Sequence, residues 1–123
     1  MMDRENQYKK IIESLKLLSL PFDEQEKCFP EFVDVPFEVI DTFENAILQL
    51  PILIEFGCFD NMIIASLLRL QNLINLILNN PMFKDLDSEQ FRIDEEWRKV
   101  RVMARDTLQI MGEPLGKPDR NYI

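Results

Sequence analysis

Apolar side chains recur every three or four residues along four long stretches of this chain, and no stretch alternates apolar and polar residues with a period of two. A spacing of three and four residues gathers apolar side chains on one face of an α-helix. The chain has only 3 glycines among 123 residues, which also favours helices over a sheet with tight turns. We therefore predict an all-α fold: a bundle of four main helices with short extra helical turns in the connectors.

Capping residues and prolines give the expected boundaries of the helices. The predicted main helices begin near Asp3, near Pro36 with Asp34 as N-cap, after Asp60 and after Asp94, and end before Pro21, at Leu50, near Asn79 and at Gly112. Pro51 is expected either to kink the second helix or to separate a short continuation, Ile52 to Phe56, that Gly57 ends. Asp23 and Glu26 resemble a capping box and predict a turn of helix through Cys28, and another short turn is expected after Asp87.

The third main helix is apolar around most of its circumference, which is typical of a helix packed on several sides. We expect it at the centre of the bundle, and we expect one shared core of Phe43, Ile47, Leu67, Leu68, Ile74, Trp97, Ala104 and Leu108. Leu76 lies in the polar stripe of this helix. Either a neighbouring segment covers it, which we favour, or it is an exposed apolar contact point.

The length of the chain indicates one domain. We assign residues 1–112 to a single helical domain and 113–123, which hold two prolines and a glycine, to an extended C-terminal tail. Four phenylalanines of the connectors are expected to anchor the loops on the bundle: Phe22, Phe29, Phe32 and Phe83.

Several classes of function lack the residues that they need. The chain has no histidine, only two cysteines, and no glycine-rich phosphate loop or nucleophile elbow. Carboxylate pairs such as Glu38 with Asp41, or Asp94 with Glu95 and Glu96, could hold a divalent ion only if a second helix supplied ligands. We favour the interpretation that these carboxylates are surface acids and N-caps. We therefore expect that the protein is not an enzyme and binds no metal and no cofactor.

Neither a leader nor a membrane span is expected from the sequence. The apolar stretch behind Lys9 and Lys10 is interrupted by Glu13 and Lys16, unlike the core of a signal peptide. The longest apolar run, residues 62–78, contains Arg69 and three amide side chains and is short for a span. We therefore expect a cytoplasmic protein without membrane contact.

The net charge of −8 is concentrated in one part of the chain. Residues 23–60 hold ten acidic residues and one lysine, a net charge of −9, whereas residues 61–123 carry nine charges of each sign. Such acidity argues against direct binding of nucleic acid. A run of like charges is often only a solvated face, but it can also bind a basic partner. For that second interpretation the candidate contact residues are Glu31, Asp34, Glu38, Asp41, Glu44 and Asn45.

The chain resembles the small immunity proteins of bacterial toxin systems, including contact-dependent growth inhibition and related polymorphic toxins. The segments PEFVDVPFEVIDTFENAILQLP (30–51) and DEEWRKVRVMARDTLQIMG (94–112) carry the resemblance, which extends to size, acidity and helical architecture. It implies a tight complex that neutralises a cognate toxin domain, often a nuclease. The tyrosine pair with which helical colicin-type immunity proteins bind is absent, so that binding mode is not transferred.

Basic nucleases bind phosphates, so clustered carboxylates can occupy their substrate groove. The function expected from the sequence is therefore inhibition of a basic toxin domain, a nuclease, by binding alone. The alternative is a helical adaptor or oligomeric scaffold without catalytic activity, in which an apolar surface, for example around Leu76, pairs copies of the chain. The third candidate function is a metal-dependent helical enzyme.

Overall fold

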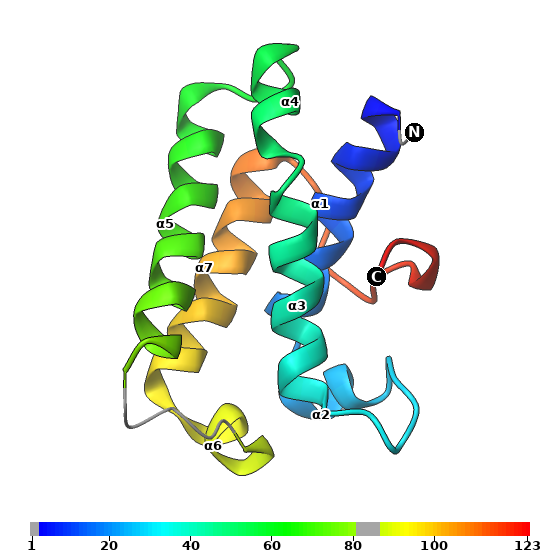
Figure 1. The fold of residues 1–123 in the computed structure, drawn as a ribbon, viewed down its shortest axis with the longest axis vertical. Coiled ribbons are helices and arrows are strands. Elements are labelled where there is room, and N and C mark those ends of the chain that lie inside the picture. Colours follow the sequence, from blue (N-terminus) through cyan, green and yellow to red (C-terminus); the bar gives the residue numbers. More distant parts are fainter. Residues whose placement is uncertain (1–2, 81–86) are drawn as a thin grey trace.

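The structure is a computed structural model that describes residues 3–80 and 87–123. Within these residues every regular element is a helix, and the predicted all-α class is confirmed. Four long helices build the bundle: α1 (Arg4–Ser19), α3 (Val35–Ile47), α5 (Asn61–Leu78) and α7 (Glu95–Met111). Three short helices occupy the connectors: α2 (Phe22–Glu26), α4 (Leu50–Glu55) and α6 (Ser88–Ile93) (Figure 1).

An aspartate caps the N-terminus of each long helix. One carboxylate oxygen of Asp3, Asp34, Asp60 and Asp94 accepts a backbone N–H bond from the first turn, at donor–acceptor distances between 2.8 and 3.3 Å. These bonds satisfy N–H groups that have no partner inside the helix. The C-terminus of α7 is the left-handed Gly112, with a φ of 73°. The predicted starts of the helices and the predicted stop at Gly112 are confirmed.

Two predicted boundaries are wrong. Asp23 and Glu26 form no capping box, because α2 begins at Phe22 and the Pro21 carbonyl already accepts bonds from the backbone of its first turn. The second main helix ends at Ile47, and the chain starts again as α4 at Leu50. The break thus precedes Pro51, which sits in the first turn of α4 where its missing N–H costs nothing.

The central helix of the bundle is α1, and the prediction of a central α5 is wrong. Helix α1 packs against both α3 and α7, whereas among the described elements the main partner of α5 is α7 (Figure 1). Only one stripe of α5 is buried, made of Ser66, Leu67, Leu70, Ile74 and Ile77. Ile63, Ile64 and Leu73 pack partly against the core, and Met62, Leu68, Leu76 and Leu78 are exposed. By length and composition alone this 18-residue helix could also cross a membrane.

Two leucines of α5 are exposed to solvent because this helix lies at the edge of the bundle. Leu68, predicted in the core, is 47% exposed, and Leu76, which we expected to be covered, is 63% exposed. The other predicted core residues are buried, and Trp97 lies in an aromatic cluster with its ring centroid 4.8 Å from that of Phe91. Of the connector phenylalanines, Phe22 is buried and Phe29 packs against the core. Phe32 instead is 89% exposed, contrary to expectation, and Phe83 lies outside the described residues.

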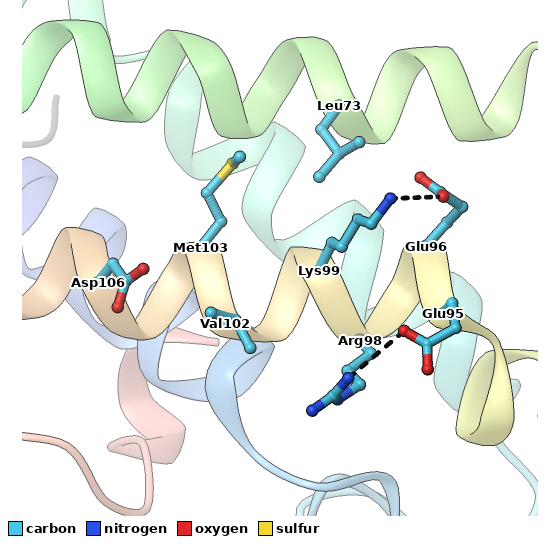
Figure 2. A pocket seen from close by; sticks show the side chains of 8 residues that line it. All are labelled: Leu73, Glu95, Glu96, Arg98, Lys99, Val102, Met103 and Asp106. Atoms are coloured by element: carbon cyan, nitrogen blue, oxygen red, sulfur yellow. Dashed lines mark hydrogen bonds and ion pairs between the residues drawn. The ribbon is translucent and has the colours of Figure 1, made fainter.

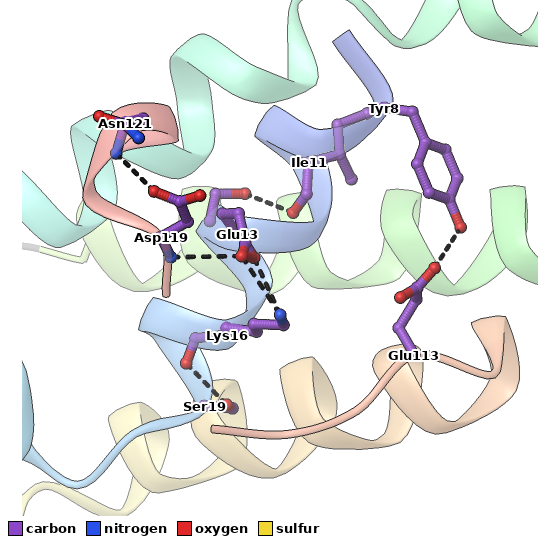
Figure 3. A network of polar contacts seen from close by, with 9 residues as sticks. Tyr8, Ile11, Glu13, Lys16, Ser19, Glu113, Asp119 and Asn121 are labelled. Carbon is purple, nitrogen blue, oxygen red and sulfur yellow. Dashed lines mark hydrogen bonds and ion pairs between the residues drawn. The ribbon is translucent and has the colours of Figure 1, made fainter. Parts of the chain in front are cut away.

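The C-terminal tail folds back along α1 (Figure 3). The Tyr8 hydroxyl donates to the Glu113 carboxylate at 3.0 Å. The backbone N–H of Asp119 donates to Glu13, which also pairs with Lys16 at 3.1 Å. A 3₁₀ helix, Arg120–Tyr122, follows, and Ile123 packs against the core. The tail therefore holds its place on α1 through specific polar contacts.

The contact between Tyr8 and Glu113 predicts that stability depends on pH in the alkaline range. Burial, and then the bond and the negative charge of Glu113, raise the pKa of Tyr8 from 10.0 to about 12. Because the folded state favours the neutral phenol, its contribution to stability is complete below about pH 10 and is lost as pH rises towards 12. The chain has only two tyrosines, so the phenolate absorbance of Tyr122→Phe reports Tyr8 alone.

We expect that titration to have its midpoint near pH 12, about two pH units above that of the unfolded chain. Glu113→Gln removes the negative charge beside the phenol and should move the midpoint towards 10. An unshifted midpoint in Tyr122→Phe would mean that the tail does not cover Tyr8 in solution.

Candidate functional site

Helix α3 presents the candidate residues because its sequence separates apolar and acidic positions. Val39, Ile40, Phe43, Ala46 and Ile47 are buried and fix the helix in the bundle. The acidic positions fall between them on the outer side, where Asp34 is exposed and the carboxylates of Glu38, Asp41 and Glu44 are half-buried. We call this outer side of α3, together with Glu31 in the preceding connector, the acidic surface.

The acidic surface has an edge that faces α5. Phe37, Asp41, Glu44 and Leu48 recur at spacings of four, three and four residues, so they form one stripe along the helix. Phe37 is 59% exposed and Leu48 is 70% exposed. Together with Asp34 and Ile40, the first three of these residues line a cavity of about 370 Å³ that Leu78 of α5 closes on the other side.

The opposite edge faces α1 and the tail. Here Glu38, Asp41, Thr42 and Asn45 line a second cavity, of about 320 Å³, with Lys10, Asn121, Tyr122 and Ile123. The side-chain amide of Asn45 donates to Asp41 at 3.2 Å. The side-chain amide of Gln7 donates to Gln49 at 3.0 Å and ties this edge to α1. Asp41 borders both cavities and is the centre of the acidic surface.

None of the acids of α3 forms an ion pair with a described residue, whereas α1, α2 and α7 each hold at least one ion pair. In the described part of the chain, each ion pair joins a glutamate to a cation three residues later on the same helix: Glu13–Lys16, Glu24–Lys27, Glu95–Arg98 and Glu96–Lys99. No described lysine or arginine nitrogen lies within 4.0 Å of a carboxylate of α3. Glu38, Asp41 and Glu44 therefore gather unpaired negative charge on one side of one helix, and Lys10 borders only the cavity beside α1.

A third cavity, of about 520 Å³, lies between α5 and α7 (Figure 2). Leu73, Val102 and Met103 give it an apolar wall. Four of its charged side chains are paired, Arg98 with Glu95 and Lys99 with Glu96, and Asp106 adds an acid without an ion pair. The side chains of its lining thus have a net formal charge of −1, against −3 for the cavity that Leu78 closes.

The structure brings together five of the six predicted contact residues: Asp34, Glu38, Asp41, Glu44 and Asn45 all lie on the outer side of α3. Glu31 is exposed in the connector and lines neither of the two cavities beside α3. Sequence reasoning missed the apolar members, Phe37, Leu48 and Leu78. Phe37 could have been found, since its spacing to Asp41 and Glu44 places it among the acids. Leu78 comes from another helix, and no spacing along the chain indicates it.

The carboxylates do not converge as metal ligands. Among the described residues, no group of three or more histidine, cysteine or acidic side chains is arranged to hold an ion. Asp94, considered above as a ligand, accepts bonds from the backbone N–H groups of Glu96 and Trp97. Comparisons with protein families, with characterised proteins and with solved structures found no match to this chain.

Proposed function

We propose that this protein neutralises a basic toxin domain, a nuclease, by binding it through the acidic surface and without catalysing a reaction. The observation that carries the proposal is the grouping of unpaired acids: Glu38, Asp41 and Glu44 share the outer side of α3 and have no described cation within 4.0 Å, whereas α1, α2 and α7 each hold at least one ion pair. Leaving several carboxylates of one helix unpaired costs self-repulsion, which a basic partner relieves.

The exposed apolar side chains beside the acids support the same proposal. Phe32, Phe37 and Leu48 are 89%, 59% and 70% exposed, and all lie within or next to the acidic surface. Protein interfaces typically bury a few large apolar side chains inside a polar rim. The resemblance of residues 30–51 and 94–112 to immunity proteins points to the same class of partner.

The proposal is tested by protection. Cells that express a candidate toxin domain, captured with this chain and identified by mass spectrometry, should survive only when this chain is also present. Affinity should fall steeply as salt rises from about 0.1 to 1 M, where the Debye length falls from about 10 to 3 Å. A captured domain that kills cells equally with and without this chain, or an affinity that does not change with salt, would contradict the proposal.

An oligomeric scaffold is the second candidate function, and the outer side of α5 favours it. Leu68 and Leu76 are 47% and 63% exposed there, two helical turns apart. Two such helices could bury these leucines against each other. Sedimentation distinguishes the two functions: a mass that rises with concentration and returns to that of one chain in Leu76→Asp supports the scaffold.

A further inference from the structure

The cavity between α3 and α5 combines two kinds of lining. Phe37, Ile40 and Leu78 supply apolar surface, and Asp34, Asp41 and Glu44 supply carboxylates. Its volume of about 370 Å³ is near the lower limit of small-molecule pockets, which is room for one long side chain. Phe37 is 59% and Leu78 is 36% exposed, so apolar surface remains accessible in this cavity.

The lining selects the chemistry of the occupant. A purely apolar side chain would take water away from three carboxylates without replacing it. A small hydrated cation would satisfy the carboxylates but leave the faces of Phe37 and Leu78 in water. An acidic group would be repelled. The occupant that fits is a cation at the end of an apolar stem.

The carboxylates favour arginine over lysine. Asp34 uses one oxygen to cap α3, and Asp41 accepts a bond from Asn45, so each has only part of its hydrogen-bonding capacity left. Among the described residues, no side chain donates a hydrogen bond to the Glu44 carboxylate or forms an ion pair with it. A guanidinium presents five donors in a planar fork and can serve several partly occupied carboxylates at once, and it also stacks on an aromatic face such as Phe37.

We propose that this cavity is an arginine pocket: it receives one arginine side chain of the basic partner, with the methylenes on Phe37, Ile40 and Leu78 and the guanidinium at Asp41 and Glu44. This inference rests on the proposed function for the identity of the partner. The pocket itself is a property of this chain, and it is measurable without any partner.

The test uses n-butylguanidinium, which reproduces the head and stem of arginine, in a titration followed by amide chemical shifts of the isolated protein. We expect saturable shifts at Phe37, Asp41, Glu44 and Leu78. Guanidinium, which lacks the stem, and n-butylurea, which lacks the charge, should each bind at least about tenfold more weakly, since each loses one of the two kinds of contact.

Variants separate the two parts of the pocket. Asp41→Asn with Glu44→Gln should weaken n-butylguanidinium about tenfold or more, and Phe37→Ala about threefold. The matched control is Glu26→Gln with Glu55→Gln, which removes two charges from exposed positions outside α3 and should change the affinity less than twofold. Phe37 and Glu44 are not in the core, so circular dichroism should show intact helices in every variant.

Three results would overturn the inference. Equal affinities for guanidinium and n-butylguanidinium would show that the apolar residues of the pocket do not contribute to binding. Shifts of equal size at Glu95 and Glu96 would show unspecific attraction to acids. A dimer in sedimentation that Phe37→Ala dissociates would assign the cavity to a second copy of this chain. If n-butylguanidinium binds as expected but no toxin is neutralised, the proposed function fails and the pocket stands. If cells are protected but n-butylguanidinium gives no saturable shifts, the pocket fails and the proposed function stands.

Discussion

Leu67→Ala is expected to lower the free energy of unfolding by about 2 to 5 kcal/mol, whereas Leu68→Ala should lower it by about 1 kcal/mol or less. The two leucines are neighbours with the same chemistry. Leu67 is fully buried in the seam between α5 and α7, so its removal leaves a cavity in the core. Leu68 is 47% exposed, so water fills much of the space that its side chain leaves.

Urea denaturation of the two variants measures the difference directly, provided that the slope of the free energy against denaturant stays that of the original chain. The pair is its own control, because backbone effects of the substitution are similar at adjacent positions of one helix. Equal costs at both positions would show that Leu68 is covered in solution, as in a dimer through α5, and would favour the scaffold function.

Reversal of the charges at the centre of the acidic surface should have the largest effect on binding. We expect Glu38→Lys with Asp41→Lys to weaken the toxin complex by about 2 to 5 kcal/mol, which is about 30-fold to several thousand-fold. The loss has two parts. Fewer acids steer the basic partner, which lowers the association rate, and the new lysines repel it in the complex, which raises the dissociation rate.

The matched control is Glu89→Lys with Asp106→Lys, which changes the net charge equally at exposed positions on α6 and α7. It should retain protection of cells and nearly the original affinity. Surface plasmon resonance of both double variants separates the two rates. Full protection by Glu38→Lys with Asp41→Lys would exclude the acidic surface and leave the outer side of α5 or the C-terminal tail as the surface to test.

The long helices could be predicted from the sequence because their boundaries are local. An aspartate cap and a glycine stop depend on a few neighbouring residues, and Asp34, Asp60, Asp94 and Gly112 all act as expected. The order of helices in the bundle is not local. Helix α5 has the widest apolar circumference, yet α1 is central, because α1 is held by α3, α7 and the tail together. Periodicity shows how much of a helix is apolar and not which neighbours cover it.

The candidate site was likewise predictable from the sequence where it depends on local spacing, and not where it depends on neighbouring helices. The acids of α3 could be placed on one side from their spacing alone. That Glu38 and Glu44 lie on opposite edges depends on which helices flank α3, since α1 borders one edge and Leu78 of α5 closes the cavity at the other. Phe37 was not among the residues selected from the sequence, and its exposure beside Asp41 becomes visible only in the structure.

The central position of α1 has a consequence for biosynthesis. Helix α1 is translated before its partner α7. The bond between Tyr8 and Glu113 spans 105 positions of the chain, and the bond between Glu13 and Asp119 spans 106. When a ribosome has synthesised only α1 to α5, the central helix α1 therefore still lacks α7, one of the two long helices that pack against it. Because contacts so distant in sequence form slowly and late, we expect stable folding only after α7 has left the exit tunnel. Nascent chains halted before α7 should then be protease-sensitive throughout, with no early folded portion.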